Sequence, residues 1–200
     1  MMAFRLFLAA VVAALAIAAA PARAGEAPAG QPQEIISRYL LVDTRGRAIT
    51  NEDFPGRFQL ISFGYTFCPD VCPTTLAAMA QIMRKLGPRA DRVQPIFISV
   101  DPERDTKAVL AKYTAYFDPR IIGLTGTPEL VKAAADHYKV TYRKYLAPGA
   151  KPDSYSIDHT AGMFVVGPDG EFVARLAHDL SPDVAASRIA EMVDAAGAAK

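Results

Sequence analysis

The sequence of 200 residues has a formal net charge of +1, with two cysteines and no tryptophan. This length fits one domain of about 100–200 residues, which can bury a core without stabilising disulfides. The near-zero charge and the absence of long basic runs exclude nucleic acid as an expected partner. The two cysteines are separated by three residues, and so short a disulfide loop would stabilise the chain little. The pair therefore indicates chemistry rather than a structural crosslink.

The first two dozen residues have the pattern of an export signal. Arg5 precedes an uncharged run at 6–22, and Ala22 and Ala24 form an Ala-x-Ala cleavage site. We therefore expect a signal peptide at residues 1–24. The alternative is an uncleaved anchor, because 17 uncharged residues reach the lower end of the roughly 17–25 that span a bilayer. In both cases we expect a periplasmic protein, with membrane association only through residues 6–22, which would tether an uncleaved chain to the inner membrane.

The remaining sequence has the order of strands and helices typical of an α/β domain. Residues 25–34 are small, polar and proline-containing, which predicts a flexible tether before a domain at 35–197. Expected strands lie at 39–43 and 48–49 (a hairpin), 58–65, 93–100, 121–124 and 140–145, and at 155–166 and 171–176 (a second hairpin). Expected helices lie at 74–86, from 105 or 106 to 117, 127–139 and 181–196. The alternation predicts a central mixed β-sheet with helices on both faces and an N-terminal β-hairpin.

The most informative segment is FCPDVCP at 67–73, where a buried strand ends and a helix begins. Pro73 suits the first turn of that helix, so Cys72 lies at or next to its N-terminus. The positive end of the helix dipole there favours a thiolate, the form that binds metals and attacks as a nucleophile. Three intervening residues suit chelation better than the two of a redox Cys-x-x-Cys motif, but they do not forbid a disulfide. Two thiolates favour Cu(I) or Zn(II).

Two sulfurs need a further ligand, which should be an imidazole, and the sequence offers three histidines. His137 lies within an expected helix, where a polar surface role is favoured, and His178 is expected to be a solvated loop residue. His159 lies at the entry to an expected strand, where a structural role is the more common one. Met79 and Met83 share one helix face, which favours core packing over copper binding. The residue pattern alone leaves the third ligand open.

Aspartates near these segments have alternative roles. Asp101 closes a buried strand at the expected site edge and could tune the thiolates. The favoured role for Asp101 and Asp105 is to end that strand and cap the next helix. Asp158 either orients the ring of His159 or serves a turn.

In these segments the sequence resembles the SCO/SenC family of copper chaperones. The matching segments are GYTFCPDVCP at 64–73, ISVDPERDT at 98–106, GLTGT at 123–127, DHT at 158–160 and GPDGEF at 167–172. A Cys-x-x-x-Cys pair alone would be a weak signal. Five ordered segments between residues 64 and 172, within a resemblance that extends over about residues 39–193, are specific.

The resemblance implies a thioredoxin-like fold and one copper ion per chain, bound as Cu(I) or Cu(II) by Cys68, Cys72 and His159. It implies a metallochaperone rather than an enzyme, one that delivers copper to the dinuclear copper site of cytochrome c oxidase subunit II. A periplasmic copper donor and a thiol reductant are the other expected partners, and the chain is expected to be a monomer. Two thiolates and a neutral imidazole suit Cu(I), and an added water or carboxylate lets the set hold Cu(II).

The main alternative is a thiol–disulfide oxidoreductase that uses Cys68 and Cys72 to reduce the cysteines of the oxidase copper site. Only the chaperone needs His159. A peroxidase on the same fold is disfavoured, because the chain has no tryptophan and its second cysteine is too close to the first. A structural zinc site is disfavoured because it requires four ligands.

Overall fold

The computed structural model describes residues 34–198. The expected signal peptide at 1–24, its alternative as an anchor, and all but the last residue of the expected tether at 25–34 lie outside this range. Within residues 34–198, no helix combines the length and the apolar character needed to cross a membrane.

Nine strands and four α-helices make up the described part of the chain. The strands are β1 Leu40–Asp43, β2 Ala48–Thr50, β3 Phe58–Gly64, β4 Val93–Ser99, β5 Ile122–Thr125, β6 Tyr142–Tyr145, β7 Ser156–His159, β8 Met163–Val166 and β9 Phe172–Leu176. The helices are α1 Val71–Lys85, α2 Lys107–Phe117, α3 Pro128–His137 and α4 Pro182–Ala198, with 3₁₀ helices at Asn51–Asp53 and Gly87–Arg92 that the sequence did not predict. Seven strands form one sheet in the order β2-β1-β5-β4-β3-β8-β9.

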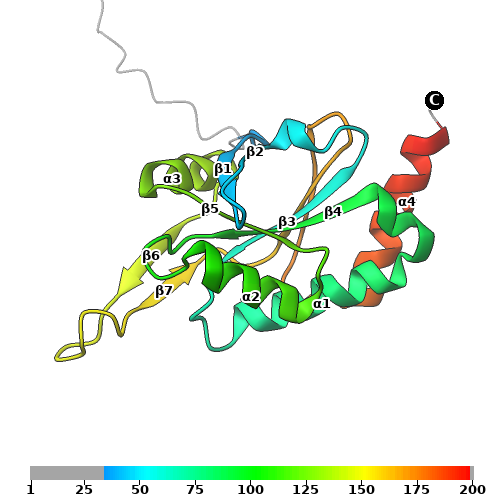
Figure 1. Cartoon of the computed structure of the whole chain (residues 1–200). Helices are drawn as coiled ribbons and strands as arrows, with labels where there is room; N and C mark the ends of the chain where they lie inside the picture. Colours follow the sequence, from blue (N-terminus) through cyan, green and yellow to red (C-terminus); the bar gives the residue numbers. More distant parts are fainter. Residues whose placement is uncertain (1–33, 199–200) are drawn as a thin grey trace, which may run out of the picture. The chain divides into compact units, whose positions relative to one another are not determined.

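The sheet is mixed, with β3, β4 and β5 parallel and the outer strands antiparallel to their neighbours. Ile61 and Phe63 of β3 belong to a core layer that includes Val131 of α3. Phe58 and Leu60, on the opposite face, belong to a layer that includes α1, α2 and α4. Helices therefore cover both faces of the sheet (Figure 1). The predicted thioredoxin-like fold with an N-terminal β-hairpin, β1–β2, is confirmed.

The prediction of a single strand over residues 155–166 is wrong, because the chain turns after His159. Gly162 has a φ of 119°, and a Cβ there would lie 2.7 Å from the carbonyl oxygen of Leu176, so the turn requires glycine. The residues before this turn form β7, which pairs with β6 in a separate two-stranded sheet. We call residues 142–159, from β6 to β7, the arm; it extends away from the main sheet (Figure 1). The residues after the turn form β8, which pairs with β9 as predicted.

The methionines predicted to lie in the core are buried, and Met79 has no exposed surface. We expect Met79→Ala to lower the free energy of unfolding by about 2–5 kcal/mol, because it leaves a cavity in a closely packed layer. Met79→Leu, which nearly conserves volume, should lower it by less than about 1.5 kcal/mol. Denaturant unfolding measures both values. A Met79→Leu variant with weakened copper binding and parental stability would contradict the assignment of this residue to the core.

Candidate metal centre

The sheet brings the candidate ligands to one edge. β3 and β4 are parallel, so the loops that follow Gly64 and Ser99 leave the sheet at the same edge. β8 is antiparallel to β3, and Met163 pairs with Ser62, so the segment that enters β8 lies at this edge as well. The cysteine loop follows β3, and His159 ends β7 shortly before β8 begins.

The ligand atoms of Cys68, Cys72 and His159 all lie within 4.8 Å of one another. The Nε2 atom of His159 is 3.3 Å from the Sγ atom of Cys72. Sulfur at about 2.3 Å and nitrogen at about 2.0 Å from a metal in a trigonal plane would be about 3.7–4.0 Å apart. The three side chains therefore fit one metal ion after small movements. Within residues 34–198 no other cluster of three histidine, cysteine or acidic side chains meets the same criterion.

Cys72 is buried and Cys68 is half-buried, and both are free thiols. The N–H of Cys72, in the first turn of α1, donates a hydrogen bond to Sγ of Cys68 at 3.4 Å. Burial raises the pKa of the Cys72 thiol far above its ordinary value. The prediction that Cys72 is a thiolate is therefore wrong for the metal-free protein. The loss of hydration raises the pKa of the thiol by more than the positive end of the helix dipole lowers it. A metal ion must displace this proton in order to bind.

His159 is neutral, because burial lowers the pKa of its imidazole. Its Nδ1 atom lies 3.1 Å from the carbonyl oxygen of Thr160, which can only accept a hydrogen bond. Nδ1 must then carry the ring proton, and Nε2 presents a lone pair to the thiol of Cys72. The backbone of Thr160 therefore orients the ring of His159. Ring orientation is one of the two roles considered for Asp158. Sγ of Cys72 and Nε2 of His159 are both candidate metal ligands, so a metal ion would take the place of the contact between them.

The other two histidines do not belong to the ligand cluster. His137 ends α3, and its Nδ1 atom is 2.9 Å from the carbonyl oxygen of Arg38. His178 follows β9 and lines a cavity of about 190 Å³ with Asp70 and Thr74 of the adjoining loop and helix. Of the three histidines, His159 alone joins the two cysteines in the ligand cluster.

Gly64 is a site residue that reasoning about ligands did not identify. A Cβ atom at this position would lie 2.7 Å from Sγ of Cys72 and 2.8 Å from the ring of Phe97. Glycine at the end of β3 therefore leaves the space that the buried sulfur occupies. The available signal was a glycine that ends an otherwise apolar strand, which often marks a close approach.

Two fully buried aspartates fix the loops around the site. Asp105 accepts hydrogen bonds from the N–H and the hydroxyl of Thr66, so it holds the start of the cysteine loop. Asp101 pairs with the guanidinium of Arg104. The side chain of Thr106 caps α2. The capping role favoured for the two aspartates is therefore wrong, and Thr106, the alternative cap that the sequence offers for this helix, is confirmed.

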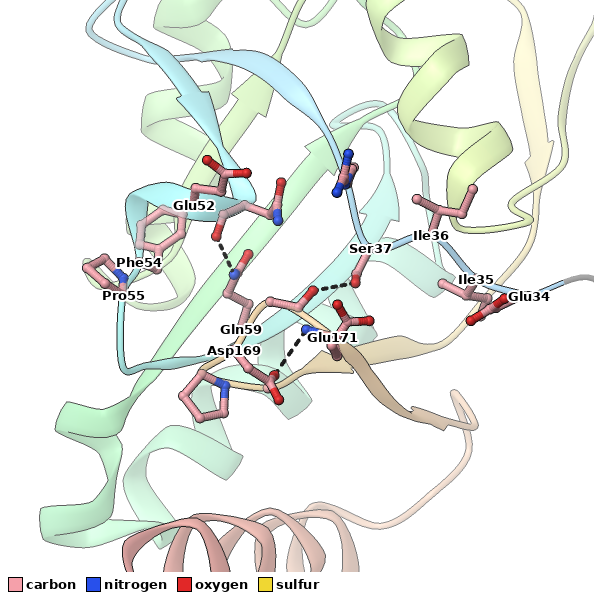
Figure 2. A pocket seen from close by; sticks show the side chains of 15 residues that line it. Glu34, Ile35, Ile36, Ser37, Glu52, Phe54, Pro55, Gln59, Asp169 and Glu171 are labelled. Carbon is pink, nitrogen blue, oxygen red and sulfur yellow. Dashed lines mark hydrogen bonds between the residues drawn. The ribbon is translucent and has the colours of Figure 1, made fainter. Parts of the chain in front are cut away.

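A separate cavity of about 590 Å³ lies at the opposite end of β3 (Figure 2). It is lined by the segment before β1, the 3₁₀ helix after β2 and the β8–β9 turn. Gln59 donates to the carbonyl oxygen of Asn51, and Ser37 donates to that of Gly170, so these polar groups bond to the walls of the cavity. The cavity is not part of the ligand cluster.

Comparisons with known proteins agree with this arrangement. A family model for SCO1/SenC matches residues 27–194. The human mitochondrial protein SCO1 homolog is 42% identical over 139 residues, which cover 68% of this chain and 45% of that protein. The copper-bound structure of ScoI from Arabidopsis thaliana has a TM-score of 0.74 at 32% identity, covering 80% of this chain and 98% of that chain. Copper-bound ScoI from Bradyrhizobium japonicum has a TM-score of 0.70 at 39% identity, covering 78% and 97%.

The chain spans about half the length of the curated relatives it matches. The family model, by contrast, covers most of the chain, including the cysteine loop, both buried aspartates and the segment around His159. The resemblance found in the sequence is confirmed, and the chain belongs to the SCO1/SenC family.

Proposed function

We propose that this protein is a copper chaperone that binds one copper ion through Cys68, Cys72 and His159. The observation that carries the proposal is the convergence of two thiol sulfurs and one neutral imidazole within 4.8 Å. Soft sulfur ligands with an imidazole favour Cu(I), and an added oxygen ligand accommodates Cu(II). The copper-bound ScoI structures of two relatives support the choice of metal.

The same geometry suits transfer of copper rather than permanent storage. Two thiolates give the Cu(I) site one net negative charge and leave the Cu(II) site neutral. Cys72 is buried, whereas Cys68 and His159 are partly exposed, so an acceptor can approach from their side. Three ligands leave a position for a ligand of the acceptor. Copper can then move by ligand exchange without release into solvent.

The proposed acceptor is the dinuclear copper site of cytochrome c oxidase subunit II. Membership of the SCO1/SenC family supports this assignment, because the solved relative BsSco is described as a member of the Sco family of cytochrome c oxidase assembly proteins. A copper donor and a thiol reductant complete the expected partners, since the two thiols must be reduced before they can bind copper. The chain is proposed to act as a monomer.

Replacement of the imidazole tests the ligand set directly. We expect His159→Ala to weaken copper binding by more than about 100-fold. Mutation of a residue that only orients a metal ligand already lowers metal affinity by about 10–100-fold, and His159 is a ligand itself. Thiol–disulfide exchange by the cysteine pair should continue, because it does not use the imidazole. The matched control is His137→Ala, which changes a histidine at the end of α3. Competition titration with a copper chelator measures the affinities, and equal values for His159→Ala and the parent would contradict the ligand set.

The second candidate function is a thiol–disulfide oxidoreductase, which the proximity of two free thiols favours. Alkylation of the reduced protein separates the two roles of the pair. Without metal we expect Cys68 to react first, because Cys72 is 2% exposed and burial raises its pKa. One equivalent of Cu(I) should protect both thiols. Mass spectrometry over time records the order in which the two cysteines are alkylated. Alkylation of both thiols at the metal-free rate after one equivalent of Cu(I) has been added would favour the redox role alone.

We propose that residues 1–24 export the chain to the periplasm, with an anchor at residues 6–22 as the alternative. The support is the basic residue, the uncharged run and the Ala-x-Ala site. Some curated relatives are mitochondrial proteins of animals, and others come from Rickettsia. Expression of the full chain in a Gram-negative bacterium should yield periplasmic protein that begins at Gly25. Full-length protein in the cytoplasmic fraction would contradict export, and full-length protein in the membrane fraction would select the anchor.

A further inference from the structure

We propose that Arg104 is a positioning residue for the metal centre, which fastens the arm to the cysteine loop and thereby holds His159 within reach of the sulfurs. The inference rests on the proposed function, because Arg104 acts here through a proposed copper ligand. Arg104 is a half-buried cation that forms no hydrogen bond with either sulfur or with the imidazole.

Arg104 joins the loop after β4 to the arm. Its Nε atom donates to the carboxylate of Asp101 at 2.6 Å. Its Nη1 atom donates to the carbonyl oxygens of Asp153 and Tyr155, at 3.1 Å and 2.8 Å. The hydroxyl of Tyr155 donates to the other carboxylate oxygen of Asp101 at 2.7 Å. The residues that lead into β7 are thus held through both their backbone and a side chain.

The face of the same guanidinium contacts the cysteine loop. Its Cζ atom lies 3.5 Å from the ring centroid of Tyr155, 4.8 Å from that of Phe67 and 5.7 Å from that of Tyr65. Phe67 directly precedes Cys68 in the chain. Guanidinium groups are attracted to aromatic faces at these distances. One planar cation therefore touches both of the segments that carry the metal ligands.

Tyr65 carries this connection to the imidazole. Its hydroxyl accepts a hydrogen bond from the N–H of Ile157 at 3.1 Å, two residues before His159. Its ring meets the ring of His159 edge to face, with centroids 6.0 Å apart. Its carbonyl oxygen accepts from the N–H of Cys68. A displacement of the arm would therefore move the imidazole relative to the first sulfur.

The arm has further contacts, and the first is the buried side chain of Ile157, which belongs to the core layer that includes α3. At its base, Thr160 and Thr141 exchange hydrogen bonds that hold the start of β6 beside the end of β7. Farther along, Lys144 and Glu103 form an ion pair, but both side chains are exposed, and such pairs contribute little. The Arg104–Asp101 pair is different, because their side chains are 13% and 0% exposed.

Lysine cannot make the contacts that Arg104 makes with Asp101, the arm and the cysteine loop. The planar guanidinium donates to a carboxylate and to two carbonyls along its edge while its face contacts three rings, whereas an ammonium is a single charged point. Arg104→Lys therefore keeps a cation beside the buried Asp101, which protects the fold, and removes the bonds to the arm. Tyr155→Phe is the milder variant, since it removes one hydrogen bond to Asp101 and keeps the ring.

The test is a double-mutant cycle on copper affinity with Arg104→Lys, His159→Ala and the combined variant. We expect Arg104→Lys to weaken binding by about 10–100-fold, as is typical of residues that orient a metal ligand. In the His159→Ala background the same change should have no further effect, because the residue acts through the imidazole. The matched control is Arg120→Lys, which disturbs an arginine–aspartate pair at the opposite edge of the sheet and should bind copper like the parent.

A measurement on the metal-free protein supports or overturns the same claim. Amide hydrogen exchange at Ile157 should accelerate in Arg104→Lys, while exchange in β3 stays as in the parent. Parental affinity in Arg104→Lys overturns the proposal, and so does an equal loss with and without His159. If Arg104→Lys does not fold, Tyr155→Phe takes its place in the test. Parental copper affinity in Tyr155→Phe would then overturn the proposal. If His159→Ala itself binds copper like the parent, the proposed function fails instead.

Discussion

The contact between Sγ of Cys72 and Nε2 of His159, at 3.3 Å across 87 residues of sequence, is the constraint on which the rest of the site depends. The sheet produces this contact. Parallel β3 delivers the cysteine loop to one edge, and antiparallel β8 requires the chain to enter at the same edge, directly after β7. Gly64 leaves space for the buried sulfur at the end of β3. The metal centre thus results from the order of the strands and from the glycine at position 64, which has no side chain to fill the space of the sulfur.

Burial determines the protonation states of Cys72 and His159, and it also favours the binding of a metal cation between them. It raises the pKa of Cys72 and lowers the pKa of His159, so both groups are neutral without metal. A bare thiolate in this place would lack hydration, whereas a thiolate bound to copper is compensated by the ion itself. The weak dielectric screening that opposes the free charge also strengthens its attraction to the metal. The partly exposed Cys68 keeps one side of the centre open to an acceptor.

The sequence predicted the elements whose signals are local. Apolar runs marked β3 and β4, and Thr127 and Pro128 marked the start of α3. The arm was missed because β7 and β6 pair only with each other, and the turn at Gly162 interrupts what looks like one strand. The state of Cys72 was missed because spacing gives its place on the helix but not its depth. Roles for paired residues such as Asp101 and Arg104 depend on long-range contacts that local patterns do not contain.

The most direct test of the central claim is X-ray absorption spectroscopy at the copper edge of the Cu(I)-loaded protein. Our account predicts two sulfur ligands and one nitrogen ligand with the outer-shell scattering of an imidazole. That scattering should disappear in His159→Ala and stay in His137→Ala. A spectrum with sulfur ligands alone, or with imidazole scattering that survives the loss of His159, would contradict the account.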